Sequence, residues 1–288
     1  MSNIGFIGAG MMGHGMAANL IKGGHLLTVM AHRNRKPIED LIAKGAKEAK
    51  SRSELAKGQD AICLCITGTP QVEETLQEIE PVLVSGQYLI DMGTSRPASS
   101  LAIAKRLAKR GIIFVDAPVG GGPQHAEAGE LVSMVGASAA VFAHVLPWLK
   151  CTSKTVVRMG EVGAGAKAKL INNYISLGQS ALVIEGYRLA REQGIDWQNM
   201  FDVNMGGAAR SGTLERMIPP AIAGNFQGYL FSLANSAKDL DYYVEAIGKS
   251  GSAADTSIAA AIRDYFRVAA EAMGGDTVQS EMLNPQKK

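Results

Sequence analysis

The stretch that decides the fold is "NIGFIGAGMMG", residues 3–13, which leads into the helical pattern "MAANLIKGGH" at 16–25. A short apolar strand, a Gly-x-Gly-x-x-Gly turn and a helix, in this order, are typical of a dinucleotide-binding unit. Gly8 permits the tight turn, Gly10 lets the backbone approach a pyrophosphate, and Gly13 lets the helix pack closely on the strand. The alternative is a glycine-rich turn that serves packing alone.

The residues around this turn indicate which dinucleotide binds. Met11 and Met12 lie at the helix start, where free N–H groups and the positive end of the dipole favour phosphates. A second apolar strand, "LLTVMA", then ends in "HRNRK" at 32–36, with no carboxylate to hold the ribose hydroxyls of NAD until Glu39. Arginine suits a phosphate monoester, so the sequence favours NADP over NAD. The residues expected to read the 2′-phosphate are His32, Arg33 and Arg35. If they form only a solvated loop, the choice between NADP and NAD stays open.

Apolar strands then alternate with helical segments, which predicts a parallel, doubly wound sheet. The strands are "DAICLCI" (60–66), "QYLIDM" (87–92) and "GIIFVDAPV" (111–119), with helices near 70–79 and 97–110. Ligands in such sheets bind beyond the carboxyl ends of the strands, so Thr67 and Thr94 are expected to line the ribose or nicotinamide. Two more strands, "LVSMVG" and "TVVRMG", close this dinucleotide-binding domain, which we assign to residues 1–162.

Three successive glycines follow the strand that ends in Asp116. Gly120, Gly121 and Gly122 carry a conformational cost that a packed protein needs a reason to bear. One reason is a nest of backbone N–H groups that binds an anion such as a substrate carboxylate. The alternative is a flexible connection between strands.

The remainder, residues 163–288, reads as an all-helical domain entered by one long helix, "AKLINNYISLGQSALVIEGYRLAREQG" at 168–194. The fold class is therefore α/β: an N-terminal Rossmann-type doubly wound sheet followed by an all-α domain. Within "GGAARSGTLE", Arg210 and Ser211 are candidate substrate-binding residues, and the alternative for Arg210 is a surface role. The last residues, "MLNPQKK" at 282–288, are expected to form a loose tail.

Composition limits the other functional classes. The 288 residues are 47% hydrophobic, with 29 basic and 27 acidic side chains and a net charge of +2, so nucleic acid is not a favoured partner. No apolar run of about 18 residues predicts a membrane span, and no cationic leader is present, so we expect a cytoplasmic protein. The three cysteines and the histidines show no ligand spacing, and no metal site is predicted.

Taken together, the motifs resemble the β-hydroxyacid dehydrogenase family, which includes 3-hydroxyisobutyrate dehydrogenases and tartronate semialdehyde reductases. The resemblance is carried by "GFIGAGMMGHGMAANL", "DAPVGGGPQHAEAGELVSMVGA", "GAGAKAKLINN" and "AKDL", and it covers nearly the whole chain. It implies that Lys169 is the acid/base group, that Asn173 orients the substrate, and that Gly120–Gly122 bind its carboxylate. It also implies that Lys238 faces the active site or the cofactor, and that the protein forms a homodimer or homotetramer.

Helical geometry separates the two lysines of "GAGAKAKLINN" without reference to a family. At 100° per residue, Asn173 lies about 40° from Lys169 and Asn172 about 60° away, whereas Lys167 points about 160° away. We therefore include Asn172 in the polar face. Near a helix start and partly desolvated, Lys169 is expected to have a lowered pKa, which suits a general base. The alternative is an exposed lysine at a helix N-terminus.

The leading hypothesis is an NADP-preferring oxidoreductase that transfers a hydride between the nicotinamide and a short, acidic β-hydroxy acid or its semialdehyde. Gly120 stands where the family usually has a serine that binds the substrate carboxylate, so the substrate stays open and a sulfonate-bearing aldehyde is included. One alternative is an imine reductase of the same superfamily, against which Lys169 argues. Another is a cofactor-binding module without catalytic activity.

Overall fold

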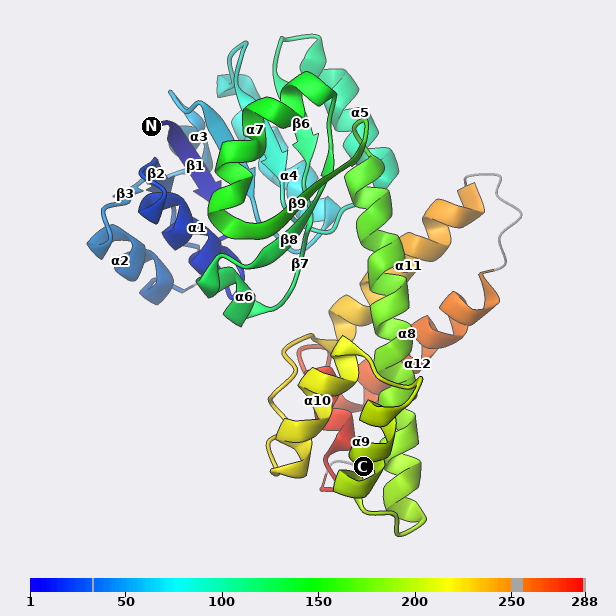
Figure 1. Ribbon diagram of the computed structural model, residues 1–288. Coiled ribbons are helices and arrows are strands. Elements are labelled where there is room, and N and C mark those ends of the chain that lie inside the picture. Colours follow the sequence, from blue (N-terminus) through cyan, green and yellow to red (C-terminus); the bar gives the residue numbers. More distant parts are fainter. Residues whose placement is uncertain (33, 250–255, 287–288) are drawn as a thin grey trace. The chain divides into compact units, whose positions relative to one another are not determined.

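The computed structural model describes residues 1–32, 34–249 and 256–286. The chain forms two compact units, residues 1–169 and 170–288. Their boundary lies in the first turns of the long helix α8 (Ala164–Glu192), drawn in green in Figure 1, a few residues after the sequence-based boundary at 162/163. We describe each unit separately.

In the described residues, unit 1 contains a nine-stranded sheet in the order β3-β2-β1-β4-β5-β6-β8-β7, with β9 paired to β8. The strands are β1 (Asn3–Ile7), β2 (Leu26–Val29), β3 (Lys47–Glu48), β4 (Ala61–Leu64), β5 (Tyr88–Asp91), β6 (Ile113–Asp116), β7 (Val119–Gly120), β8 (Leu131–Gly136) and β9 (Ser153–Gly160). Strands β1 to β6 are parallel, which confirms the predicted Rossmann-type sheet. Strand β8 instead runs antiparallel to β6 and β7, because the short α6 between β7 and β8 does not provide a parallel crossover.

Helices cover both faces of this sheet. One face carries α1 (Gly13–Lys22), α2 (Lys36–Ala43), α6 (Pro123–Ala128) and α7 (Ala139–Thr152), and the other carries α3 (Arg52–Ala56), α4 (Thr69–Ile79), η1 (Glu80–Val82) and α5 (Pro97–Ala108). The sheet has one hydrophobic core on each face. In β4, Cys63 packs in the core on the α1 face, and its neighbours Ile62 and Leu64 pack in the core on the α5 face. A strand buried on both faces reads as a continuous apolar run, which is the pattern "AICLCI".

Helix α8 begins in very close contact with the sheet of unit 1. A Cβ atom on Gly165 would lie 2.4 Å from the carbonyl oxygen of Met134 in β8 and 2.6 Å from that of Asp116 in β6. Both contacts are to backbone, which cannot yield to an added methyl group. Gly165, the second glycine of "GAGAK", is therefore required by the packing of α8 on two strands.

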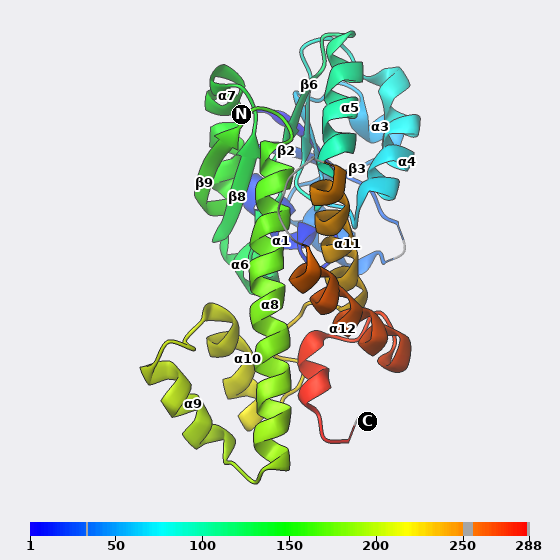
Figure 2. The ribbon, with the colours of Figure 1, turned by 90° about the vertical axis from the view of Figure 1, so that its right-hand side faces the viewer.

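Unit 2 is helical. After α8 come α9 (Trp197–Gly206), α10 (Gly212–Ile222), α11 (Leu233–Lys249), α12 (Ser257–Met273) and the 3₁₀ helix η2 (Gln279–Leu283), and α11 and α12 lie side by side in Figure 2. The all-α prediction is confirmed. The expected loose tail is wrong for Met282 and Leu283, which are buried in the core, and the Leu283 carbonyl accepts a hydrogen bond from Arg191 Nη1 at 2.6 Å. Residues 287 and 288 lie outside the described residues.

We predict that Gly165→Ala destabilises the protein by about 3 kcal/mol or more, because the new methyl group overlaps backbone atoms of β6 and β8. The control is Gly186→Ala in the same helix, where an added Cβ meets nothing within 4 Å. There the substitution should be neutral or stabilising by up to about 1 kcal/mol, the helix-propensity gain. Urea denaturation of both variants measures the difference, and equal stabilities would contradict the packing argument.

Candidate active site

The three glycines of the nucleotide turn have three different environments. Gly8 has φ +103°, and a Cβ there would lie 2.2 Å from the carbonyl oxygen of Cys65. A Cβ on Gly13 would lie 2.0 Å from the Gly8 carbonyl oxygen, whereas one on Gly10 would meet nothing within 4 Å. Gly8 and Gly13 therefore shape the turn and its packing, and Gly10 leaves open space for a ligand.

That open space belongs to a groove of about 710 Å³ in unit 1. Five of the residues expected to bind cofactor line it: Gly8, Gly10, Met11, His32 and Thr67. Helix α1 begins beside it, and its first residue is preceded by Met12, whose side chain makes no capping hydrogen bond. A cradle without side chains over Gly10, next to a helix start with no capping side chain, fits the pyrophosphate of a dinucleotide.

The other predicted cofactor residues of unit 1 lie in different surroundings. Arg33 is outside the described residues. Arg35 is 57% exposed and pairs with Glu48 at 3.0 Å and Glu39 at 3.4 Å, so its guanidinium is engaged by carboxylates. Thr94 lies in a loop held by buried Asp91, which accepts hydrogen bonds from the Gly93 N–H at 3.0 Å and the Ser95 hydroxyl at 2.6 Å.

Asp116, at the end of β6, holds the start of α8. Its carboxylate accepts the N–H of Gly163 at Oδ1 and that of Ala166 at Oδ2, both at 2.8 Å. Gly136 of β8 makes room for it, since a Cβ there would lie 2.3 Å from Asp116 Oδ1. Burial raises the pKa of Asp116 to about 6, although the two backbone hydrogen bonds act in the opposite direction. Sequence reasoning named Asp116 but missed this role. The available signal is that "GEVG", before α8, contains no capping side chain.

Lys169 follows Ala166 by one turn of α8, and Asn173 follows by another. Lys169 is 8% exposed and Asn173 is 5% exposed, whereas Lys167 is exposed. The two lysines therefore differ as the helical wheel predicts. Asn172 is exposed, so it lies at the edge of this polar face and donates to Asn173 Oδ1 at 3.4 Å.

In unit 2, Asn173 is held by an aspartate that the sequence reasoning did not identify. Its Nδ2 donates to Asp239 Oδ2 at 2.6 Å, and Asp239 is only 3% exposed. Lys238, the predicted cofactor residue, pairs with Asp239 Oδ1 at 2.9 Å and lies 5.3 Å from the centre of the Tyr242 ring. The available signal was the motif "AKDL" itself, which places an acidic residue next to the lysine.

The glycine loop is only partly available as an anion nest. Gly122 donates its N–H to His125 Nδ1 at 3.1 Å at the start of α6, and Gly120 is paired with Val132 in the β7–β8 ladder, so the predicted N–H donors narrow to Gly121. Gly121 has φ +120°, which favours glycine. A Cβ on Gly120 would have its nearest neighbour at 3.8 Å, so a larger side chain fits there.

Arg210 and Ser211 each have a local structural role in unit 2. Arg210 is 63% exposed and pairs with Glu215 at 2.8 Å. Ser211 caps α10 by accepting the N–H of Leu214 at 3.1 Å. Substrate binding by Arg210 and Ser211 stays a prediction, as does the surface role that is the alternative for Arg210.

Comparison with known proteins shows the family. Residues 3–160 match the family described as the NAD binding domain of 6-phosphogluconate dehydrogenase. Residues 163–286 match the family described as the NAD-binding domain of NADP-dependent 3-hydroxyisobutyrate dehydrogenase. The 2-(hydroxymethyl)glutarate dehydrogenase of Eubacterium barkeri is 35% identical over 253 residues, covering 86% of this chain and 83% of that protein.

The chain belongs to the β-hydroxyacid dehydrogenase family. The crystal structure of 3-hydroxyisobutyrate dehydrogenase from Salmonella typhimurium is similar to this β-hydroxyacid dehydrogenase with a TM-score of 0.88 and 25% identity over 98% of each chain. An imine reductase from Pseudomonas sp. is less similar, with a TM-score of 0.64 and 20% identity over 98% of each chain, which shows a shared fold alone. The family makes this protein an oxidoreductase that uses a nicotinamide cofactor.

In residues 1–32, 34–249 and 256–286, no helix has the length and apolar character needed to cross a membrane. The same residues contain no group of three or more His, Cys, Asp or Glu side chains arranged to hold a metal ion.

We predict that Asp116→Ala lowers the stability of this dehydrogenase by about 2–4 kcal/mol, because the buried N–H groups of Gly163 and Ala166 lose their acceptor. The control is Ser138→Ala, which removes the cap of α7, where the Ser138 hydroxyl accepts the Val141 N–H at 3.3 Å. Loss of that cap should cost about 1 kcal/mol. Chemical denaturation measures both, and an equal cost would show that Asp116 is an ordinary cap.

Proposed function

We propose that the protein is an NADP-preferring dehydrogenase or reductase acting on a short, acidic β-hydroxy acid or its semialdehyde, with Lys169 as the general acid/base. The observation that carries this proposal is the burial of Lys169 one turn after a helix start anchored to the cofactor-binding sheet. A buried lysine is uncommon unless it is paired or functional. The neighbouring Lys167, which is exposed, supplies the contrast.

The proton transfer follows from the chemistry of a lysine. In the oxidative direction the neutral Lys169 amine accepts the proton of the substrate hydroxyl, and in the reductive direction the ammonium group returns it to the new alkoxide. A nicotinamide, when bound, accepts or supplies the hydride. Lys169 is thus required to change protonation state once in each turnover, which distinguishes it from a lysine that only binds an anion.

Asn173 orients the reacting oxygen in this proposal. The hydrogen bond from its Nδ2 to Asp239 orients the amide, and the amide oxygen and the second N–H can then contact the substrate hydroxyl or its alkoxide. Asp239 therefore acts on the substrate through Asn173 and is a positioning residue. The orientation of the amide is assigned from this hydrogen bond.

The acidic end of the substrate is the part that the glycine loop would bind. The N–H group of Gly121 can donate to a carboxylate or a sulfonate, and Gly120 lacks the hydroxyl that the family usually places there. A Cβ on Gly120 would meet nothing nearer than 3.8 Å, so the missing side chain is not excluded by packing. The relatives named above for 3-hydroxyisobutyrate and 2-(hydroxymethyl)glutarate support a β-hydroxy acid class.

We also propose that the protein assembles as a homodimer or homotetramer in the cytoplasm. The support is the row of exposed apolar side chains on α8, which includes Ile175 at 55%, Leu182 at 73% and Leu189 at 54%. Apolar side chains in such a row are commonly covered by a partner.

We predict that Lys169→Ala lowers kcat by at least about 100-fold, as expected when a general acid/base is lost, while the dissociation constant for cofactor changes by less than about twofold. Lys167→Ala is the matched control and should retain nearly full activity. The assay measures reduction and oxidation over a panel of short hydroxy acids, semialdehydes, sulfonate-bearing aldehydes and a cyclic imine.

Three results would contradict the proposal: unimpaired Lys169→Ala turnover, equal losses in the two lysine variants, or turnover of the imine alone. The last would identify an imine reductase. Absence of turnover for the wild type on every substrate, with cofactor still bound, would favour a binding module.

We predict that Arg33→Asp weakens NADP binding at least about tenfold more than NAD binding, because a carboxylate would then face the 2′-phosphate. The same substitution at Arg35, which is paired with Glu48, should discriminate less between the two cofactors. Titration of both cofactors by fluorescence provides the four dissociation constants. Equal losses for NADP and NAD at Arg33 would show that the loop does not read the phosphate.

A further inference from the structure

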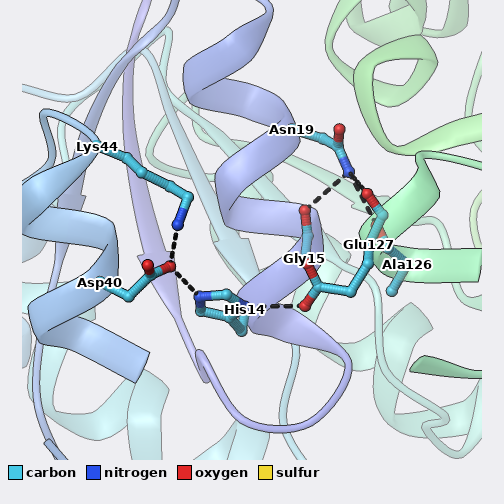
Figure 3. Close-up of polar contacts among 7 residues, drawn as sticks. All are labelled: His14, Gly15, Asn19, Asp40, Lys44, Ala126 and Glu127. Carbon is cyan, nitrogen blue, oxygen red and sulfur yellow. Dashed lines mark hydrogen bonds and ion pairs between the residues drawn. The ribbon is translucent and has the colours of Figure 1, made fainter. Parts of the chain in front are cut away.

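His14 bridges two carboxylates at the start of the helix that would bind the cofactor's phosphates. Its Nδ1 lies 2.8 Å from Glu127 Oε1 on α6, and its Nε2 lies 2.6 Å from Asp40 Oδ2 on α2 (Figure 3). Asp40 also pairs with Lys44, the residue that caps the C-terminus of α2. One imidazole ring therefore joins three elements of unit 1 that are far apart in the sequence.

These contacts favour the charged ring. Partial burial alone would lower the pKa of His14, but the hydrogen bonds and negative charge of Glu127 and Asp40 outweigh it and raise the pKa above 6.5. Lys44 and then His14 lower the pKa of Asp40. In the described chain, α7, which also packs on α1, brings no charged group into contact with the ring. With the ring protonated, the cluster of His14, Asp40, Lys44 and Glu127 holds two cations and two carboxylates, and it has no net charge.

Glu127 is fixed in this place by backbone contacts that do not involve the imidazole. Asn19 Nδ2 donates to the Ala126 carbonyl at 2.8 Å and to the Glu127 carbonyl at 3.1 Å (Figure 3). Gly15 permits the approach, since a Cβ there would lie 2.6 Å from the Glu127 nitrogen. Deprotonation of His14 therefore leaves Glu127 where it is, with its charge uncompensated.

The cluster lies beside the groove that would hold the cofactor, so its net charge acts on a bound dinucleotide. His14 and Glu127 both line the groove that Gly8 and Gly10 border. A dinucleotide carries at least two negative charges on its pyrophosphate, and an uncompensated carboxylate in the same groove repels them. The raised pKa extends the pH range over which the ring stays charged.

We propose that His14 neutralises Asp40 and Glu127 beside the dinucleotide groove and thereby makes cofactor affinity depend on a single proton. Cofactor binds more tightly while the ring is charged. When the ring loses its proton the cluster carries one net negative charge, and binding weakens. By linkage, bound cofactor raises the pKa of His14 further. The dissociation constant of the cofactor therefore rises with pH between the pKa of His14 in the free protein and its pKa in the cofactor-bound protein. The inference rests on cofactor occupying this groove, and it is independent of the role of Lys169.

The test is the dissociation constant for NADPH between pH 7 and 9.5, measured by fluorescence without substrate, so that the result is independent of turnover. The 2′-phosphate has a second pKa of about 6, so it is about nine-tenths or more ionised over this range and adds little titration of its own. We expect wild-type affinity to fall about three- to tenfold, the effect of one partly screened charge. His14→Gln should bind NADPH more weakly than the wild type at pH 7. Its affinity should lack the roughly three- to tenfold fall with pH that the wild type shows.

Two carboxylate variants test the mechanism without altering His14. Glu127→Gln should retain tight binding at pH 9.5, because the cluster then has no net charge when the ring is neutral. Glu130→Gln removes an equal charge from an exposed position three residues away and should keep the wild-type profile. A His14→Gln profile with the wild-type slope, or equal profiles for the two glutamate variants, would overturn the proposal.

Discussion

The hydrogen bonds from Gly163 and Ala166 to Asp116 are the interaction on which the proposed chemistry depends. Asp116 ends β6, which pairs with β5 and β8 inside the sheet. Its carboxylate holds the first turn of α8, and Lys169 follows one turn later. Gly136 and Gly165 are needed because they have no side chain. A methyl group on Gly136 would displace the carboxylate, and one on Gly165 would displace the helix. The position of the proposed base is thus set by backbone contacts rather than by its own long, flexible side chain.

The same carboxylate explains why "GEVGAGAKAK" resembles a phosphate loop without acting as one. A helix start binds an anion through its free N–H groups. At α1 no capping side chain occupies that place, and Gly10 is open to a ligand. At α8 the anion is already supplied by the protein as Asp116, and its negative charge offsets the positive end of the helix dipole. The helix dipole at the start of α8 is therefore partly offset by Asp116 before it reaches Lys169.

The features that could be predicted from sequence are those with local causes. The Gly8 turn, the close packing at Gly13 and the opposite exposure of Lys167 and Lys169 each follow from neighbours within a few residues, and the structure agrees with all of them. The parallel core of the sheet follows from alternating apolar strands and helices. The antiparallel β8 was not anticipated, because its direction depends on how the chain returns through the short α6.

Contacts between distant parts of the sequence were beyond this kind of reasoning. Asp239 lies 66 residues from Asn173, and Glu127 lies 113 residues from His14, so no periodicity or spacing connects them. Each distant carboxylate nevertheless determines what a predicted residue can do. Asp239 fixes the orientation of the Asn173 amide, and Glu127 with Asp40 raises the pKa of His14, a residue without a predicted function. Sequence motifs therefore locate candidate site residues of this chain, whereas the fold supplies the carboxylates that act on their charge and orientation.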